Sequence, residues 1–292
     1  MTALKARILD VDTGDLRVVL VPKNIALANG LKGGSRVRVV SNSRFVTAWV
    51  LVSDKEGEEV FLSKSISNIL EDPETVELSV YSITSSVDYI KKKLVGLKLS
   101  EDEIRSIVRD ITSGVLGEAE IASFVAAQTS VGMDVDEIVS LTKAMVETGK
   151  VLKFGEPAYD IHSIGGVPGN SKVSVVAVPI IAAAGIFIPK TSSRAITSPA
   201  GTADTMEVFA PVSFTEREVL ELAKKIKGFI IWGGTLNLAP ADDILIRVEH
   251  QLKLDPTSQM VASMLSKKLS MSVSNLIVDI PTGNEAKVGS IE

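Results

Sequence analysis

The stretch YDIHSIGGVPGN, residues 159–170, joins the end of a strand-like run to a glycine-rich loop, and an apolar helix-like run over 173–184 follows. Three glycines within five positions let backbone N–H groups approach an anion, and the helix N-terminus behind them favours negative charge. The loop matches neither the Walker A pattern nor GxGxxG. Strand, glycine-rich loop and helix in this order predict an α/β domain with a phosphate site. A structural Gly/Pro turn is the alternative interpretation.

The next segment, from Pro189 to Asp204, contains six hydroxyl residues together with Lys190 and Arg194. Hydroxyl groups donate to phosphate and ribose oxygens, and an arginine can hold a phosphate with two parallel N–H bonds. The segment follows a strand-like run over 185–189, and α/β sheets bind ligands at the carboxyl ends of their strands. These features indicate a ligand-binding loop, with a polar surface loop as the alternative.

Three later segments are weaker signals when each is taken alone. WGGTLNLAPADD, residues 232–243, follows a strand-like run over 226–232 and predicts a turn whose aspartates cap a helix over 244–250. Ser263 and Lys267 are spaced i, i+4 on the next helix and can face one ligand. Equally, Asp255 could be a helix N-cap and Lys267-Lys268 a solvated last turn. PTGNEAK, residues 281–287, is the third of these weaker signals.

Residues 1–84 and the stretch that follows them have different periodicities. Short β-runs separated by Gly-rich or charged turns fill the first part and predict a small β-barrel; they lie at residues 16–21, 36–40, 46–52, 59–62 and 75–80. From Ser85 to Leu152 the pattern is helical, with a capping box at 100–103, helices over 118–128 and 135–147, and Gly149 as a C-cap.

Composition narrows the classes of function that the chain can have. Hydrophobic residues make up 45% of the chain but aromatic residues only 4%, so the cores must consist of Val, Ile, Leu and Ala. A net charge of −5 argues against non-specific nucleic-acid binding. There is no cysteine, and His162 and His250 are the only histidines, which disfavours a thiolate or multi-histidine metal site. No export signal or membrane-length apolar segment is visible, so we expect a soluble cytoplasmic protein.

Several of these segments together resemble a known family. HSIGGVPGN (162–170), KTSSRAITS (190–198), AGTAD (200–204), WGGTLNLAPADD (232–243) and DPT (255–257) are similar to the thymidine/pyrimidine-nucleoside phosphorylase superfamily and, within it, to the archaeal AMP phosphorylase family. The similarity covers nearly the whole chain, including the N-terminal barrel. It implies phosphorolysis of a nucleoside 5′-monophosphate (AMP, and also CMP or UMP) by inorganic phosphate, giving free base and ribose 1,5-bisphosphate without a metal or cofactor.

The resemblance also implies roles for particular residues. Asp255 would give a proton to the departing base, which requires a carboxyl group that burial or nearby phosphates keep protonated. Nucleotide and phosphate would contact Gly166, Gly169, Ser193, Arg194, Ala195, Ile196, Thr197, Ser198, Thr202, Ser263 and Lys287. His162, Ser163 and Lys267 would complete the site.

The predicted fold is multidomain, with α+β and α/β parts. It consists of a small N-terminal β-barrel-like domain (1–84), a helical domain (85–155 and 241–272) and an α/β phosphate-binding domain (156–240 and 273–292). The return of 241–272 to the helical domain, and assembly into homo-oligomers, are implied by the resemblance. Because 279–288 looks like a strand and loop with no helix after it, we expect a truncated α/β domain.

Two other functions are compatible with this sequence. A phosphoribosyltransferase of the same architecture would need sites for pyrophosphate and Mg²⁺, and its activity would not survive EDTA. A non-catalytic, truncated assembly or nucleotide-binding subunit would form stable oligomers and would catalyse no reaction.

Overall fold

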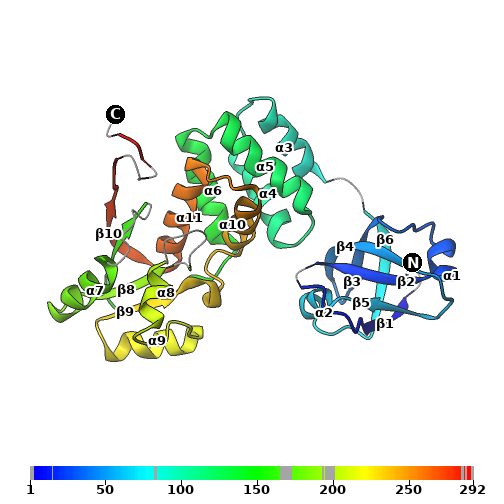
Figure 1. Ribbon diagram of the computed structural model, residues 1–292, viewed down its shortest axis with the longest axis horizontal. Coiled ribbons are helices and arrows are strands. Elements are labelled where there is room, and N and C mark those ends of the chain that lie inside the picture. Colours follow the sequence, from blue (N-terminus) through cyan, green and yellow to red (C-terminus); the bar gives the residue numbers. More distant parts are fainter. Residues whose placement is uncertain are drawn as a thin grey trace. The chain divides into compact units, whose positions relative to one another are not determined.

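The computed structural model describes residues 3–14, 16–81, 84–164, 173–192, 194, 201–283, 286 and 288–290. The chain divides into two compact units (Figure 1). The first comprises Met1–Val87 and Ser113–Ala119, and the second comprises Asp88–Thr112 and Glu120–Glu292. The first unit holds the barrel, and the second holds both the helical and the α/β elements.

The barrel has six strands in the closed order β1-β5-β2-β4-β3-β6. Their bounds are β1 Leu4–Ile8, β2 Val18–Pro22, β3 Arg36–Ser41, β4 Arg44–Ser53, β5 Glu59–Leu62 and β6 Thr75–Val80, with short helices α1 Lys23–Ala28 and α2 Lys64–Leu70. Alternate residues such as Val37, Val39, Val46 and Val50 are fully buried and fill the interior. The predicted barrel and five of its strands are confirmed.

The helical elements of the second unit come from two separate stretches of sequence. They are α3 Ser85–Leu94, α4 Glu101–Thr112, α5 Glu118–Val131, α6 Val135–Glu147, α10 Pro240–Leu252 and α11 Thr257–Ser270. Helix α11 packs on α6, and α10 packs on α4. The predicted capping box is present: the Ser100 N–H donates to Glu103 Oε2 at 2.7 Å, and the Glu103 N–H to Ser100 Oγ at 3.3 Å.

Gly149 is not the C-cap of α6 that the sequence predicted. The cap of α6 is Thr148, and Gly149 lies against the backbone of Leu238. A Cβ atom at position 149 would come 2.0 Å from the Leu238 carbonyl oxygen, so close approach of two backbones requires glycine here.

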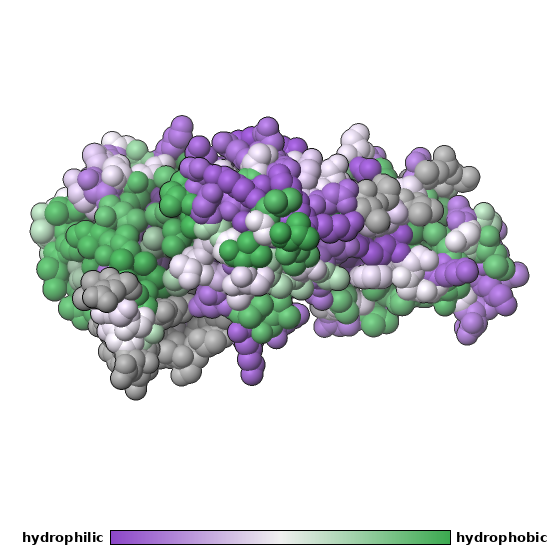
Figure 2. Space-filling model, turned by 90° about the horizontal axis from the view of Figure 1, so that it is seen from above, coloured by the Kyte–Doolittle hydropathy of each residue, from purple (hydrophilic) through white to green (hydrophobic). Residues whose placement is uncertain are grey.

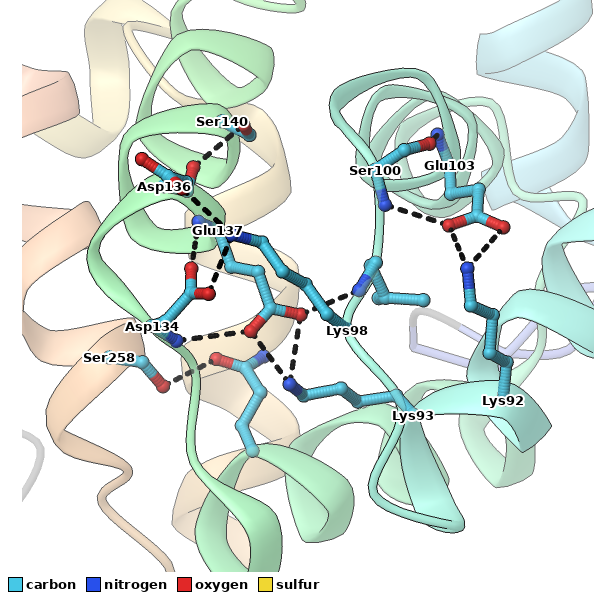
Figure 3. Close-up of polar contacts among 12 residues, drawn as sticks. Lys92, Lys93, Lys98, Ser100, Glu103, Asp134, Asp136, Glu137, Ser140 and Ser258 are labelled. Atoms are coloured by element: carbon cyan, nitrogen blue, oxygen red, sulfur yellow. Dashed lines mark hydrogen bonds and ion pairs between the residues drawn. The ribbon is translucent and has the colours of Figure 1, made fainter.

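A buried ion pair joins α3 to α6 (Figure 3). Lys93 Nζ donates to both carboxylate oxygens of Glu137 at 2.8 Å, and the two side chains are only 4% and 2% exposed. Glu137 also accepts the backbone N–H of Leu99 at 2.8 Å and that of Asp134 at 3.0 Å. One ammonium and one carboxylate therefore neutralise each other, and both carboxylate oxygens accept more than one hydrogen bond.

The α/β elements form parallel strands with their carboxyl ends at one edge. They are β7 Ala158–Ser163, β8 Ile188–Ser192, β9 Gly228–Trp232 and β10 Val273–Asp279, with α7 Val173–Ala183, α8 Thr202–Glu207, α9 Glu216–Lys225 and the 3₁₀ turn Gly233–Leu236. Strand β10 pairs with β7, and β8 with β9. The Tyr159 N–H donates to the Phe187 carbonyl at 2.9 Å, which places β7 beside β8. The expected strand over 185–189 is shifted, because β8 begins at Ile188 and ends three residues beyond the expected strand, inside the predicted loop.

Apolar side chains lie at the surface over α7 and β10. Val176 and Ile180 of α7 are 60% and 64% exposed, and Ile277 of β10 is 66% exposed. Figure 2 shows hydrophobic surface gathered over this part of the second unit, at the left. Among the residues described, none of the helices combines the length and apolarity needed to cross a bilayer.

Candidate functional site

One cavity of the second unit collects residues from β7, β8, α10 and α11. Four residues singled out from the sequence, His162, Asp255, Ser263 and Lys267, line it although they lie far apart in the chain. Further polar residues line the same cavity: Thr191, Ser192, Glu249, Gln259 and Lys268. The carboxyl ends of β7 and β8 therefore face α11, as expected for a ligand site of an α/β sheet.

Asp242 organises the α11 side of the cavity. Its carboxylate is fully buried, accepts a hydrogen bond from Ser263 Oγ at 2.8 Å and lies 2.5 Å from Lys267 Nζ. Burial alone would lower the pKa of Lys267, but the carboxylate of Asp242, helped by those of Asp243 and Glu249, raises it. Lys267 is thus a fixed cation, and Ser263 has a fixed orientation.

The predicted capping role of Asp242 is wrong. Helix α10 begins at Pro240 after the N-cap Ala239, without a side-chain cap, and Asp242 turns into the core. The sequence offered little signal for this, since an aspartate in a first helical turn is ordinarily explained by the helix dipole.

Two lysines share one carboxylate at the sheet side of the cavity. Lys268 Nζ lies 2.6 Å from Asp160 Oδ2, and Lys190 Nζ lies 3.5 Å from Asp160 Oδ1. All three side chains are at most 4% exposed. The interpretation of Lys267-Lys268 as a solvated turn is therefore wrong for both residues. Lys190 was noted in the predicted ligand-binding loop but given no role of its own, and Asp160 was not singled out.

His162, at the end of β7, is largely buried. Burial, followed by the charges of Lys268 and Lys190, lowers the pKa of His162 well below its ordinary value. Its Nδ1 atom is buried and has no hydrogen-bond partner within the described part of the chain. The imidazole is therefore neutral near pH 7 and offers a hydrogen bond to a ligand but no charge.

Asp255 lies at the exposed side of the cavity, just before α11. The helix begins at Thr257, and Pro256 occupies the N-cap position, so the alternative interpretation of Asp255 as the cap is not what the structure has.

Arg194 is held by acidic residues. Its guanidinium donates to both carboxylate oxygens of Glu207 at 2.5 and 2.7 Å and to Asp204 at 3.2 Å, and it stacks 4.7 Å from the Trp232 ring. The Glu207 carboxylate raises the pKa of Arg194 further. Thr202 begins α8, which carries both of these acids. Of the described part of the chain, the cavity lining includes neither Arg194 nor Thr202.

The other predicted site residues divide into two groups. Ser163 is the last residue of β7 and pairs in register with Asp279. Eight lie outside the described residues: Gly166, Gly169, Ser193, Ala195, Ile196, Thr197, Ser198 and Lys287. Within the described ranges, His, Asp and Glu side chains form no group of three that could hold a metal ion.

Comparison with known proteins agrees with this arrangement. Residues 87–149 match the helical bundle domain of the glycosyl transferase family, and residues 155–286 match the α/β domain of that family. The proteins named AMP phosphorylase from Hyperthermus butylicus and Pyrococcus furiosus are 50% and 46% identical over 286 and 292 residues. These alignments cover 98% and 99% of this chain but 57% and 58% of the relatives, so the chain spans little more than half their length.

A solved structure shows a related architecture. Anthranilate phosphoribosyltransferase from Thermus thermophilus superposes with a TM-score of 0.52 at 25% identity, covering 66% of this chain and 58% of that one. Both domains of one family match in order, and the cavity lies where β7 and β8 of the α/β domain meet α10 and α11. This chain therefore belongs to the glycosyl transferase family defined by that helical bundle and that α/β domain.

Proposed function

We propose that the chain carries the substrate pocket of a nucleotide phosphorylase. The reaction would convert a nucleoside 5′-monophosphate (AMP, and also CMP or UMP) and inorganic phosphate into free base and ribose 1,5-bisphosphate. The observation that carries the proposal is the meeting of His162, Asp255, Ser263 and Lys267 in one cavity. The names of the two archaeal relatives support the same assignment.

The proposed reaction is a substitution at C1′ of the ribose. An oxygen of inorganic phosphate attacks C1′ of the ribose while the bond from C1′ to the base nitrogen breaks and its electron pair goes to the base. Asp255, at the open side of the cavity, supplies the proton that the departing base needs. Ser263 and the cation of Lys267 face the base, and their shared contact with Asp242 fixes both.

The decisive experiment measures adenine released from AMP with and without inorganic phosphate, in the presence of EDTA and with adenosine as the control substrate. Phosphate-dependent release from AMP alone supports the proposal. Asp255→Asn should then lower kcat by roughly 10²–10⁴-fold while nucleotide still binds. Absence of release from this chain and from a C-terminally longer one would refute it. Activity on CMP and UMP is measured in the same assay, and formation of a homo-oligomer by sedimentation.

The likeness to anthranilate phosphoribosyltransferase supports a second candidate. A phosphoribosyltransferase would transfer ribose 5-phosphate from a pyrophosphorylated sugar to an amine or base, with Mg²⁺. Consumption of such a donor that EDTA abolishes, with no phosphorolysis of AMP, would favour this second function over the first.

A further inference from the structure

Asp160, Lys190 and Lys268 form a buried cluster with one carboxylate and two amines. A single carboxylate can neutralise only one ammonium, so the cluster carries a net positive charge when both lysines are protonated. Lys268 holds the closer position, 2.6 Å from Asp160 Oδ2, and also donates to the Thr191 carbonyl at 3.2 Å and to its Oγ1 at 3.3 Å. Among the described residues, the polar contacts of Lys190 are both 3.5 Å long, to Asp160 Oδ1 and the Thr191 carbonyl.

This asymmetry decides which amine gives up its proton. Burial, followed by the neighbouring charge of Lys268, lowers the pKa of Lys190 to about 7, although Asp160 partly opposes the shift. Burial also lowers the pKa of Lys268, with Asp160 opposing. Because Lys190 has the weaker contacts, it is the neutral member above pH 7, and Lys268 and Asp160 then form a balanced pair.

The cluster lies next to the cavity. Lys268, Thr191 and the neutral His162 all line the cavity, and no described residue bonds to the buried Nδ1 of His162. The other cation of the lining, Lys267, is already matched by Asp242. Within the described residues, the positive charge that the cavity can gain therefore comes from Lys190 and Lys268.

Other charged groups on neighbouring elements do not cancel this gain. Helix α8 carries Asp204 and Glu207, which pair with Arg194, and α10 contributes Glu249 beside Lys267. Helix α7 and strand β9 have no charged residue. On β10, the acidic residue Asp279 lies in register with Ser163, the residue after His162 at the carboxyl end of β7, and it does not contribute to the pKa shifts of Lys190 or Lys268.

We infer that Lys190 is a positioning residue that couples proton uptake to the binding of an oxyanion in the cavity. When Lys190 is protonated, it shares the Asp160 carboxylate with Lys268, and the Lys268 ammonium can then interact with the anion. The incoming proton comes from solvent. The ligand class is a divalent oxyanion, either inorganic phosphate or the phosphate of a nucleotide. As a statement about that same pocket, the inference rests on the proposed function.

The test is calorimetric titration of the 292-residue chain with sodium sulfate at pH 8, in two buffers with different ionisation enthalpies. Sulfate does not titrate in this range, so any proton taken up belongs to the protein. Wild type should take up between half a proton and one proton, roughly, on the basis of a free-state pKa near 7. Above pH 7 the sulfate affinity should fall by up to about tenfold per pH unit.

Lys190→Met should abolish both the proton uptake and the pH dependence, because it leaves the balanced Lys268–Asp160 pair. Lys190→Arg keeps the charge permanently and should bind sulfate with no proton uptake, which covers the case that the methionine variant fails to fold. Lys227→Met, at an exposed ion pair with Glu156, is the matched control and should behave as wild type.

Titrations with inorganic phosphate, AMP and adenosine separate the two sources of the oxyanion. Uptake with phosphate alone assigns the cluster to the attacking phosphate, whereas uptake with AMP but not adenosine assigns it to the 5′-phosphate. The inference is overturned if wild type binds no anion, if it binds sulfate without proton uptake, or if Lys190→Met retains the uptake. These measurements involve no turnover, so absence of adenine release would count against the proposed function alone.

Discussion

Two buried ionic groups of the same unit differ in their balance of charge. Lys93 and Glu137 form a one-to-one pair in which both carboxylate oxygens accept hydrogen bonds. Asp160 instead serves both Lys190 and Lys268, at unequal distances. Burying the charges costs free energy in both groups, yet only in the first group do contacts within the protein offset that cost. The difference separates an ion pair that holds helices together from one that is completed by a ligand.

The largest expected effect comes from breaking the balanced pair. Glu137→Gln leaves the Lys93 ammonium buried without a counter-charge, and we expect a loss of about 3–5 kcal/mol in the free energy of unfolding. Urea unfolding can be followed by Trp232 fluorescence in a Trp49→Phe background, because the chain has only these two tryptophans. Asp136→Asn, at the exposed pair with Lys98, is the control and should cost less than about 1 kcal/mol. Equal losses in the two variants would contradict the comparison.

The second test removes the shared carboxylate. Asp160→Asn leaves two amines without a counter-charge, and we expect a loss of about 3 kcal/mol at pH 7. The loss should shrink at pH 9, because an uncharged amine needs no partner, and the pKa of Lys190 is about 7. A loss that does not change with pH would show that the lysines remain charged and would remove the distinction between the two groups.

The third test uses the pH dependence of the wild-type chain. The folded-state pKa of Lys190 is about 7 and the ordinary value is 10.5, so between these values the unfolded chain binds more protons than the folded one. Stability from this residue is therefore lost as pH falls towards 7 and gained as pH rises, by about 2 kcal/mol before other lysines titrate. Lys190→Met should flatten that rise and be at least as stable as wild type at pH 7. The same unfolding assay at pH 7, 8 and 9 measures both effects.

The smallest effect is expected at Asp242, the other carboxylate of the cavity. Ser263→Ala removes the hydrogen bond to Asp242 and a long one from Lys267, but Asp242 keeps its contacts with Lys267 and Gln259, so we expect a loss of about 1 kcal/mol in the free energy of unfolding. Ser266→Ala, whose hydroxyl donates to a helix carbonyl, is the matched control. A loss above about 3 kcal/mol would mean that Lys267 and Gln259 together do not satisfy Asp242.

Periodicity predicted most of the fold, and the failures have local causes. The predicted runs over 36–40 and 46–52 became β3 and β4 because their alternate valines point into a barrel. Strand β1 was missed because only Leu4 and Ala6 in LKARI are even half-buried, so its pattern is weak. Helices α1 and α2 were missed because each is at most seven residues long and buries only two or three of them.

The site was predicted less completely than the fold. The i, i+4 spacing of Ser263 and Lys267 correctly placed both on one face towards a cavity. The charges beneath that cavity could not be found in this way, because whether Lys268 and Asp242 are solvated or buried depends on which elements pack against α10 and α11. Those packing partners, β7, β8 and α6, come from distant parts of the chain. The domain boundaries and the roles of the individual site residues remain predictions.

The contact between Gly149 and the Leu238 backbone also has a consequence for the order of folding. The two residues are separated by the whole of β7, α7, β8, α8, α9 and β9, and α11, which packs on α6, follows later still. Such non-local contacts form slowly, because the entropy cost of closing a long loop comes before the contacts can stabilise the chain. During synthesis the face of α6 that packs on α11 therefore stays uncovered until α11 leaves the ribosome, whereas α4, which also packs on α6, is made before it.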